Sequence, residues 1–254
     1  MEAVTLTNIS KRYGSVEALR GVSLSVAPGE LFGIIGPDGA GKTSLFRILT
    51  TLLLADGGSA SVCGLDVVKD YKAIRRRVGY MPGRFSLYPD LTVEENLNFF
   101  ATVFHTAIEE NYDLVRDIYR QIEPFRKRRA GALSGGMKQR AALIRTLALD
   151  PQLLLLDEPF SALDYQTRLM VSADICRLIR QAGKTMIIVT HDLSEAISLA
   201  DKVYVLSARP ATIKAVLPIR LTLPDASPLA ARNAPEFPYY FKQLWEELTD
   251  ETTN

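Results

Sequence analysis

The sequence is poor in cysteine, long apolar runs and net charge, and each shortage excludes a class of protein. Its two cysteines, Cys63 and Cys176, lie far apart and outside any C-x-x-C spacing, so neither a disulfide scaffold nor a zinc site is expected. Apolar runs such as residues 153–156 have the length of a strand and not of a membrane span. The net charge of +1 gives no electrostatic reason to expect a nucleic acid partner.

What remains is the composition of an ordinary globular protein, with 47% hydrophobic and 23% charged residues over 254 positions. That length suits one large domain or two small ones. The first six residues offer neither the basic nor the apolar segment of a secretory signal. We therefore expect a reducing compartment, and a protein that needs another chain to carry any membrane spans.

One glycine-rich loop has the flanks that phosphate binding requires. It fits G-x-x-x-x-G-K-[ST], follows the apolar run at 31–35 and precedes a helical pattern that begins at Leu45. Glycines let backbone N–H groups curl around an anion, and the helix directs its positive end to the same place. A glycine turn that binds nothing is the alternative, which the flanks disfavour. The predicted nucleotide-binding residues are Gly36, Pro37, Asp38, Gly39, Ala40, Gly41, Lys42, Thr43 and Ser44.

Two side chains of this loop have specific predicted partners. The ammonium of Lys42 adds a positive charge for the β- and γ-phosphates, and the Thr43 hydroxyl can ligate Mg²⁺.

Alternating patterns around the loop predict strands. Residues 4–9 alternate with one slip and residues 22–26 alternate again, with a predicted turn at 11–15 between them. The turn carries Tyr13, which is either a surface tyrosine or an aromatic platform for adenine, and its position favours neither. Further strands are expected at 59–63 and 78–81, with a helix at about 71–77.

Helical spacing interrupts the alternation of strands and helices between residues 91 and 121. Thr92 followed by Glu95 predicts a capping box at the start of this region. We expect one apolar face, formed by Leu97, Phe100, Ala101 and Phe104. The region is interpreted as a helical insertion.

A second glycine pair follows at Gly135 and Gly136, where Ser134 can cap a helix. Two glycines in the first turn leave backbone N–H groups accessible to an anion. Each costs about 1 kcal/mol relative to alanine, and a purely structural helix gains nothing from that cost. A ligand is therefore the favoured explanation.

Two apolar runs end in polar residues that can reach a phosphate. The run at 153–156 ends in Asp157 and Glu158, and a run at 185–190 ends at His191. Ligands of parallel sheets bind beyond the carboxyl ends of the strands. We predict that Asp157 holds Mg²⁺ and that Glu158 polarises water as a general base. The alternatives are carboxylates that close a turn and a structural histidine, and function is favoured over both.

The end of the chain changes in character. Six of the thirteen prolines lie from Pro210 onward, so loops should dominate after the strands predicted at 203–206 and 213–217. A short amphipathic helix is then expected, marked by Phe241, Leu244, Trp245 and Leu248.

Taken together, these motifs resemble the ATP-binding subunit of an ABC transporter over roughly residues 4–217. Tyr13 stands in the adenine-stacking position, residues 36–43 form the Walker A loop and residues 153–157 form Walker B. Glu158 stands in the place of the catalytic glutamate and His191 in that of the switch histidine. The resemblance implies further nucleotide contacts by Ser134, Gly135, Gly136 and Gln139 of the signature and by Asp164 of the D-loop.

The resemblance implies an α/β fold. It has a P-loop NTPase (RecA-like) core with a mainly parallel sheet, an N-terminal antiparallel β subdomain and an α-helical subdomain inserted at about 84–148. Residues 1–220 would form the ABC ATPase domain and residues 221–254 a proline-rich tail. The implied protein hydrolyses ATP with Mg²⁺ and pairs head to tail with a second nucleotide-binding subunit, as a homodimer or a heterodimer. Transmembrane permease subunits would hold it at the cytoplasmic face of the cell membrane.

One position departs from the family pattern. Where the family usually has a glutamine, this chain has Gly83, and glycine offers no side-chain oxygen to Mg²⁺ or to the attacking water. We hypothesise that ATP binding survives while hydrolysis or its coupling weakens.

The resemblance also changes along the chain, which leaves the direction of transport open. Up to the signature, including residues 80–89, it is similar to multidrug-type exporters, whereas residues 159–210 look like nitrate, sulfonate or taurine importers, as in a mosaic. Export is favoured, because the helical insertion meets the membrane partner in such transporters. The alternatives are an importer-type ATPase, a soluble ABC ATPase of DNA repair or the ribosome, and a regulatory module with weak turnover. The soluble class has coiled-coil insertions or a second cassette, and neither is found here.

Overall fold

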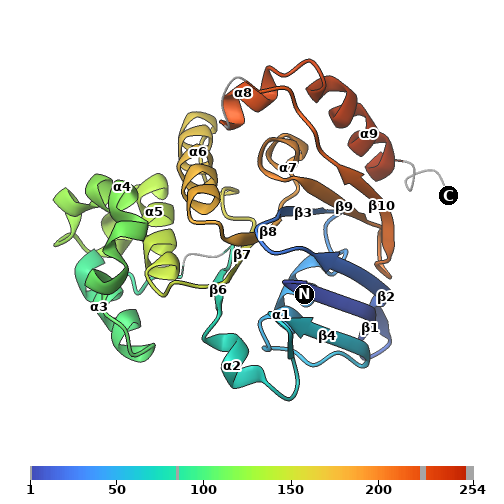
Figure 1. Cartoon of the computed structure of the whole chain (residues 1–254), viewed down its shortest axis with the longest axis horizontal. Coiled ribbons are helices and arrows are strands. Elements are labelled where there is room, and N and C mark those ends of the chain that lie inside the picture. The colour runs from blue at the N-terminus through green and yellow to red at the C-terminus, as the bar shows by residue number, and fades with distance from the viewer. Residues whose placement is uncertain (1, 84–85, 224–226, 250–254) are drawn as a thin grey trace.

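The computed structural model describes residues 2–83, 86–223 and 227–249, and a six-stranded sheet forms the centre of this part of the chain (Figure 1). The strand order is β10-β9-β3-β8-β7-β6. The first strand, β10, is antiparallel to β9, and all other neighbours are parallel, so the predicted mainly parallel sheet is confirmed. The bounds are β3 (Leu31–Ile35), β6 (Val78–Met81), β7 (Leu153–Asp157), β8 (Thr185–Val189), β9 (Lys202–Leu206) and β10 (Ile213–Pro218).

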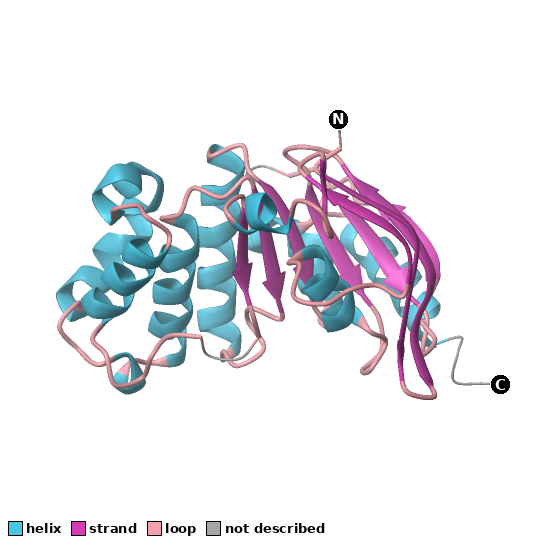
Figure 2. Cartoon of the chain, turned by 90° about the horizontal axis from the view of Figure 1, so that it is seen from below, coloured by secondary structure: helices cyan, strands magenta, loops and turns pink. Residues whose placement is uncertain are grey.

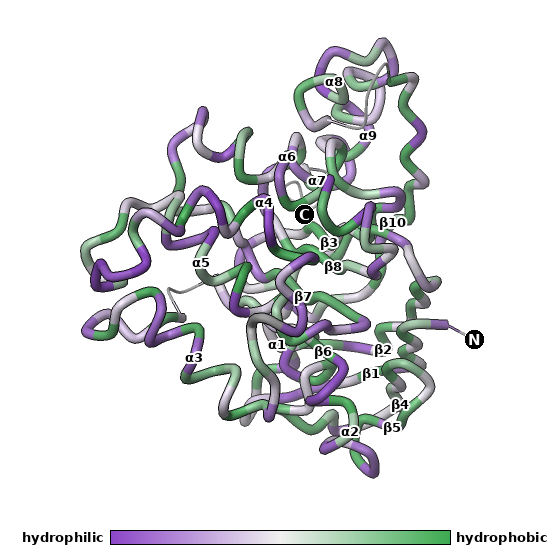
Figure 3. Tube along the Cα trace, turned by 60° about the vertical axis from the view of Figure 1, so that its left-hand side comes forward, coloured by the Kyte–Doolittle hydropathy of each residue, from purple (hydrophilic) through white to green (hydrophobic). Residues whose placement is uncertain are grey.

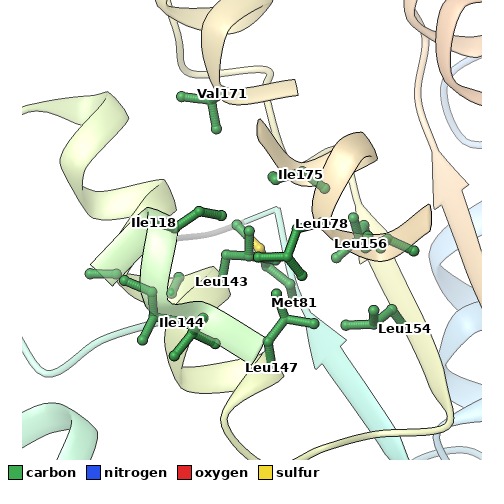
Figure 4. Packing of buried hydrophobic residues seen from close by; sticks show 14 of the residues in the cluster. Met81, Ile118, Leu143, Ile144, Leu147, Leu154, Leu156, Val171, Ile175 and Leu178 are labelled. Atoms are coloured by element: carbon green, nitrogen blue, oxygen red, sulfur yellow. The ribbon is translucent and has the colours of Figure 1, made fainter. Parts of the chain in front are cut away.

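Both faces of this sheet are covered, which explains why its strands are apolar throughout. Leu153 and Leu155 of β7 belong to a core cluster with residues of α1 (Lys42–Leu49), whereas Leu154 and Leu156 belong to another cluster with residues of α5 (Gly135–Leu147) and α6 (Tyr165–Gln181). Successive side chains of a strand point to opposite faces. Figure 4 shows the second cluster, and Figure 3 shows the hydrophobic character of β3, β7 and β8.

The N-terminal part forms a separate antiparallel sheet of order β2-β1-β4-β5. The slip at residues 7–8 is confirmed, because Asn8 adopts a φ of 52° where the register of β1 shifts. The predicted turn at 11–15 is present but shorter, because only residues 14 and 15 form it: the hairpin pairs as far as Tyr13 and Val16, and Tyr13 ends a strand. Cross-strand hydrogen bonds extend both strands past the end of the alternating pattern. The bounds are β1 (Val4–Tyr13), β2 (Val16–Val26), β4 (Gly57–Val62) and β5 (Leu65–Asp66).

Helices gather at the end of the molecule opposite the antiparallel sheet (Figure 2). They are α3 (Val93–Val103), α4 (Tyr112–Ile122) and α5, joined by 3₁₀ turns at Ile108–Asn111, Glu123–Phe125 and Ala130–Ala132; the short α2 (Tyr71–Arg75) lies before β6. The capping box is confirmed, since Thr92 Oγ1 accepts from the Glu95 N–H and the Glu95 carboxylate accepts from the Thr92 N–H. On the predicted apolar face, Leu97 and Ala101 are buried but Phe104 is exposed.

The tail is more helical than predicted. A short helix, α8 (Pro228–Arg232), precedes α9 (Phe237–Thr249), and both lie beside α7 (Leu193–Leu199) in Figure 1. Leu244 is fully buried, but Phe241 and Trp245 are 37% and 56% exposed. The structure contains the predicted helix, and Phe237, Tyr240 and Leu248 pack beside Leu244 on its apolar side. The division at residue 220 stays a prediction. No helix in the described part of the chain has the length and apolarity that a bilayer span needs.

Candidate functional site

The main candidate site is a hollow of about 430 Å³ beyond the carboxyl end of β3. Residues 38–44 of the glycine loop form its floor, and Tyr13, Val16 and Ala18 of the antiparallel sheet form a wall. Glu158 and Arg209 complete the lining. The position agrees with the rule that ligands of open α/β sheets bind outside the carboxyl ends of the strands.

Close packing explains two glycines of the loop. A Cβ on Gly41, whose φ is +86°, would lie 2.8 Å from Leu19 Cδ2 and 3.1 Å from the carbonyl of Ala18. A Cβ on Gly36 would lie 3.0 Å from the carbonyl of Leu206. The loop is thus held between β2 and β9, and larger residues would push it out of place.

Lys42 is a buried cation at the start of α1. Its side chain is 6% exposed, and its ammonium donates to the carbonyls of Gly36 at 2.6 Å and Pro37 at 2.9 Å. Burial lowers the pKa of Lys42, while the carboxylates of Asp38, Glu158 and Asp157 raise it. The loop therefore holds a positive charge against its own carbonyl oxygens.

The two residues predicted to hold a metal ion are brought together. The Thr43 hydroxyl donates to the Asp157 carboxylate, and Tyr80 Oη donates to Asp157 Oδ2 at 3.4 Å. Burial raises the pKa of Asp157, and burial also raises the pKa of Tyr80 to about 12. The sequence analysis did not predict that Tyr80 belongs to the site. Its hydroxyl group near the end of β6, a strand that pairs with β7, could have indicated it.

Glu158 and His191 also meet at the site. His191 Nδ1 lies 3.4 Å from Glu158 Oε2. Glu158 adopts a left-handed backbone with a φ of 48°, and its N–H donates to the carbonyl of Val189 at 2.8 Å. A non-glycine residue in this region costs about 1–3 kcal/mol and is typical of functional sites. The strain directs the carboxylate into the hollow.

Tyr13 lies where an adenine platform is expected. Its ring is 45% exposed, and its hydroxyl shares a hydrogen bond of 3.0 Å with Ser44 Oγ at the start of α1. The stacking role itself stays a prediction, as do the roles of the other site residues.

None of the predicted signature and D-loop residues belongs to the described lining of the hollow: Ser134, Gly135, Gly136, Gln139 and Asp164. Two of them cap helices instead. Ser134 Oγ accepts from the Met137 N–H at 3.4 Å, and Asp164 Oδ1 accepts from the Thr167 N–H at 3.0 Å.

Packing offers a second explanation for Gly135 and Gly136 beside the favoured one of a ligand. A Cβ on Gly136 would lie 2.5 Å from Thr167 Cγ2, and one on Gly135 would lie 3.2 Å from Leu163 Cδ2. Because α5 begins this close to residues 163–167, packing favours a small residue at Gly136 most strongly, whereas the neighbour of Gly135 is the flexible end of a leucine. Their contact with a nucleotide therefore needs other support.

Gly83 lies against the site more closely than the sequence could indicate. An ideal Cβ there would stand 2.8 Å from the carbonyl oxygen of Asp157 and 3.5 Å from Glu158 Cβ. Its neighbours Arg84 and Phe85 in the exporter-like run fall outside the described residues. A glutamine at this position would therefore add a steric effect to any gain of an amide oxygen.

We predict that Gly83→Gln hydrolyses ATP about five-fold faster than Gly83→Ala, since one hydrogen bond to the attacking water contributes about 1 kcal/mol. Both variants carry the same crowded Cβ, so their comparison isolates the amide. Steady-state ATPase rates and ATP dissociation constants test this. Equal rates in the two variants would contradict the hypothesis that Gly83 weakens hydrolysis by lacking an oxygen.

Comparison with known proteins connects this geometry to a family. Residues 19–161 match the family model described as ABC transporter. The chain is 34% identical to an uncharacterised ABC transporter ATP-binding protein, YtlC of Bacillus subtilis, over 98% of this chain and 96% of the relative. It is 38% identical to the Nod factor export ATP-binding protein I of Burkholderia orbicola, over 80% of this chain and 67% of that protein.

An import protein and a solved structure complete the comparison. Identity is also 38% to the sulfate/thiosulfate import ATP-binding protein CysA of Methylococcus capsulatus, over 81% of this chain and 61% of that protein. A dimeric post-hydrolysis structure of the ATP-binding cassette MJ0796, bound to ADP and Pi, superposes with a TM-score of 0.74 at 28% identity and covers 85% of this chain and 99% of that one.

Proposed function

Because the chain belongs to the ABC transporter family as an ATP-binding subunit with ATPase activity, we propose that it powers the export of a solute through separate transmembrane permease subunits. The observation that carries the proposal is that Lys42, Thr43 and Glu158 line one hollow. Asp157 contacts Thr43, and His191 lies beside Glu158. An importer of the nitrate, sulfonate or taurine type is the second candidate, favoured by the resemblance of residues 159–210.

In this proposal each residue has a separate task at the triphosphate. Lys42 leaves its loop carbonyls to bind the β- and γ-phosphates. Glu158 polarises the attacking water, and His191 holds the Glu158 carboxylate and reaches the γ-phosphate. The face of Tyr13 stacks on adenine.

The residues present fit Mg²⁺, which keeps several waters and takes only one or two protein ligands beside substrate phosphates. Thr43 and Asp157 offer a hydroxyl and a carboxylate that already contact one another. No larger cluster of acidic, histidine or cysteine side chains occurs among the described residues, and this mode of binding needs none. When bound, the ion would neutralise charge on the phosphates.

The signature residues would act on the nucleotide of a second copy. The start of α5 is separate from the hollow of its own chain, yet Ser134 and Gly135 are exposed there. Head-to-tail pairing would bring these residues, together with Gly136, Gln139 and Asp164, over the triphosphate of the partner copy. The dimeric MJ0796 structure, bound to ADP and Pi, supports the pairing of two copies. A homodimer and a heterodimer are equally compatible with it.

A second hollow, of about 420 Å³, is our proposed docking groove for the permease at the cytoplasmic face of the membrane. It lies between the core and the helices, and Leu52, Phe100, Phe104 and Arg145 contribute to its lining. Tyr80, Pro82 and Ser86 of the exporter-like run line it too, which supports the export direction. Arg145 is 8% exposed. Its guanidinium donates to the carbonyl of Ser86 and lies over the face of the Phe100 ring.

We predict that Leu52→Glu combined with Phe104→Glu lowers co-purification with the permease at least ten-fold, because buried unpaired carboxylates cost several kcal/mol. Both side chains are now exposed, at 59% and 42%, so folding and basal ATP hydrolysis should persist. Tyr239→Glu combined with Leu229→Glu is the matched control on the tail. The measurement is affinity purification from detergent-solubilised membranes of the source organism, with mass spectrometry of the bound chains.

ATP-driven transport by the purified complex in inside-out vesicles then tests the direction. Accumulation of solute inside such vesicles supports export, and ATP-driven release supports the importer. Unchanged recovery of a permease with the double glutamate variant would contradict the groove. Purification with ribosomes or DNA in place of a membrane protein would contradict the proposal as a whole.

A further inference from the structure

An arginine that is distant from the glycine loop in sequence reaches it in the fold. Arg209 lies in the segment between β9 and β10, yet its guanidinium donates to the carbonyl oxygen of Gly39 from Nε at 3.1 Å and from Nη2 at 2.9 Å. It lines the same hollow as Lys42 and Glu158. The sheet order explains the meeting, because β9 and β3 are neighbours and their carboxyl ends adjoin.

The segment that carries Arg209 is anchored on both sides. Ser207 Oγ accepts from the Thr212 N–H at 2.9 Å, which closes the segment on itself. Ala211 is fully buried; its N–H donates to the carbonyl of Ala18 at 3.0 Å, and its own carbonyl accepts from Arg20. These bonds attach the segment of Arg209 to β2, the strand whose Ala18 lines the hollow.

The contact with Arg209 can fix the backbone orientation of Gly39. Its φ is +77°, and a Cβ added to it would stand 2.6 Å from Nη2 of Arg209. Glycine adopts a wide range of φ and ψ, so the plane of the peptide that carries the Gly39 carbonyl can turn. A carbonyl dipole turned towards a phosphate would repel it. The two hydrogen bonds from Arg209 fix the orientation of the Gly39 carbonyl. They also place a second positive charge in the hollow beside Lys42.

We propose that Arg209 is a positioning residue for the nucleotide, which orients the Gly39 peptide and raises the affinity of the loop for a triphosphate. The inference rests on the proposed nucleotide site. It concerns affinity and not the chemical step, because the guanidinium bonds to the loop and neither to Glu158 nor to Asp157.

Arg209→Ala is expected to raise the dissociation constant and the KM for Mg·ATP about ten-fold, the effect of losing one charge-assisted contact, while kcat stays within about two-fold. Arg209→Lys keeps the positive charge but cannot donate two hydrogen bonds to the Gly39 carbonyl from one planar group. This variant should bind Mg·ATP more weakly than wild type. Arg20→Ala is the matched control, because this exposed arginine pairs with Glu17 outside the hollow. Fluorescent-nucleotide titration and steady-state kinetics are the measurements.

The outcomes separate the inference from its premise. An alanine variant that binds within two-fold of wild type, a lysine variant as tight as wild type, or a loss confined to kcat each overturns the role of Arg209. Full ATP affinity in Lys42→Met would overturn the nucleotide site itself. Thermal unfolding without nucleotide should be the same in wild type and Arg209→Ala; a large fall in Tm would assign Arg209 to stability instead.

Discussion

Replacing Lys42 with methionine is expected to lower the affinity for Mg·ATP by at least two orders of magnitude. The ammonium is the one full positive charge on the floor of the hollow formed by residues 38–44. Each hydrogen bond from a charged donor contributes about 1.5–3 kcal/mol, and two such bonds to phosphate oxygens correspond to the predicted loss. Methionine keeps the length of the stem, so the packing around it is retained.

The same substitution should not destabilise the protein without nucleotide. Lys42 is buried, and burial lowers its pKa, so its charged form is costly to the empty fold. That cost is offset by the hydrogen bonds to the carbonyls of Gly36 and Pro37. Methionine removes the buried charge and these two bonds together, and the two effects on stability oppose one another. We therefore expect a similar Tm for both proteins without ligand.

Thermal shift measurements distinguish the two effects. A ligand stabilises the folded state by RT ln(1 + [L]/Kd), which is about 2.7 kcal/mol at a hundred-fold excess over Kd. Wild type should gain this stabilisation from Mg·ATP and Lys42→Met should not. Lys242→Ala, on the exposed face of α9, is the control. A Lys42→Met protein that binds Mg·ATP as tightly as wild type would remove the basis of the proposed site.

The motifs that sequence alone predicted correctly are those with local causes. The capping box of Thr92 and Glu95 needs only one helical turn, and the apolar run of β7 needs only a sheet covered on both faces. The placement of Lys42, Thr43 and Asp157 at one edge of the sheet follows from the rule that ligand sites form beyond the carboxyl ends of parallel strands, and their roles stay predictions.

The features that sequence missed depend on contacts between distant segments. Gly136 is small because Thr167 lies against it, and Gly83 because the carbonyl of Asp157 does. Arg209 stands 170 residues from Gly39, and only the order of β9 and β3 in the sheet brings them together. Such distances between segments leave no periodic signal in a single chain.

Which side of α9 is buried depends on distant contacts for a related reason. Helical spacing fits the set of Phe241, Leu244 and Leu248 as well as it fits Phe237, Leu244 and Leu248, because both lie within one apolar stripe. Which set is buried depends on the core cluster of Ile35 and Val205 beneath the helix. A hydrophobic pattern predicts that a face exists but not how it is rotated.

Glu158→Gln is expected to lower ATP turnover at least a hundred-fold, the typical contribution of a general base, while ATP binding persists. Glutamine has the same shape, and its amide oxygen can still accept from His191, whose Nδ1 lies 3.4 Å from the present carboxylate. What it loses is the basicity that activates water. Hydrolysis should therefore stop at a step after binding.

Removal of this charge should also stabilise the closed, ATP-bound pair of copies. The carboxylate of Glu158 would repel the γ-phosphate, and it helps to raise the pKa of Asp157, second to burial. Without it the pKa of Asp157 falls, so the ionised form that holds Mg²⁺ persists to lower pH. The variant should thus retain Mg·ATP at acidic pH values where protons begin to displace Mg²⁺ from the wild type.

Size-exclusion chromatography with light scattering tests this: Glu158→Gln should be dimeric with Mg·ATP and monomeric after removal of Mg²⁺ by a chelator. Asp157→Asn is the matched contrast, because it removes the neighbouring carboxylate and with it the metal ligand, so no dimer should form. A Glu158→Gln protein that stays monomeric at every ATP concentration would contradict the head-to-tail sandwich. One that turns over at the wild-type rate would show that Glu158 is not the general base, and His191, whose Nδ1 lies 3.4 Å from the Glu158 carboxylate, would then be tested by His191→Ala.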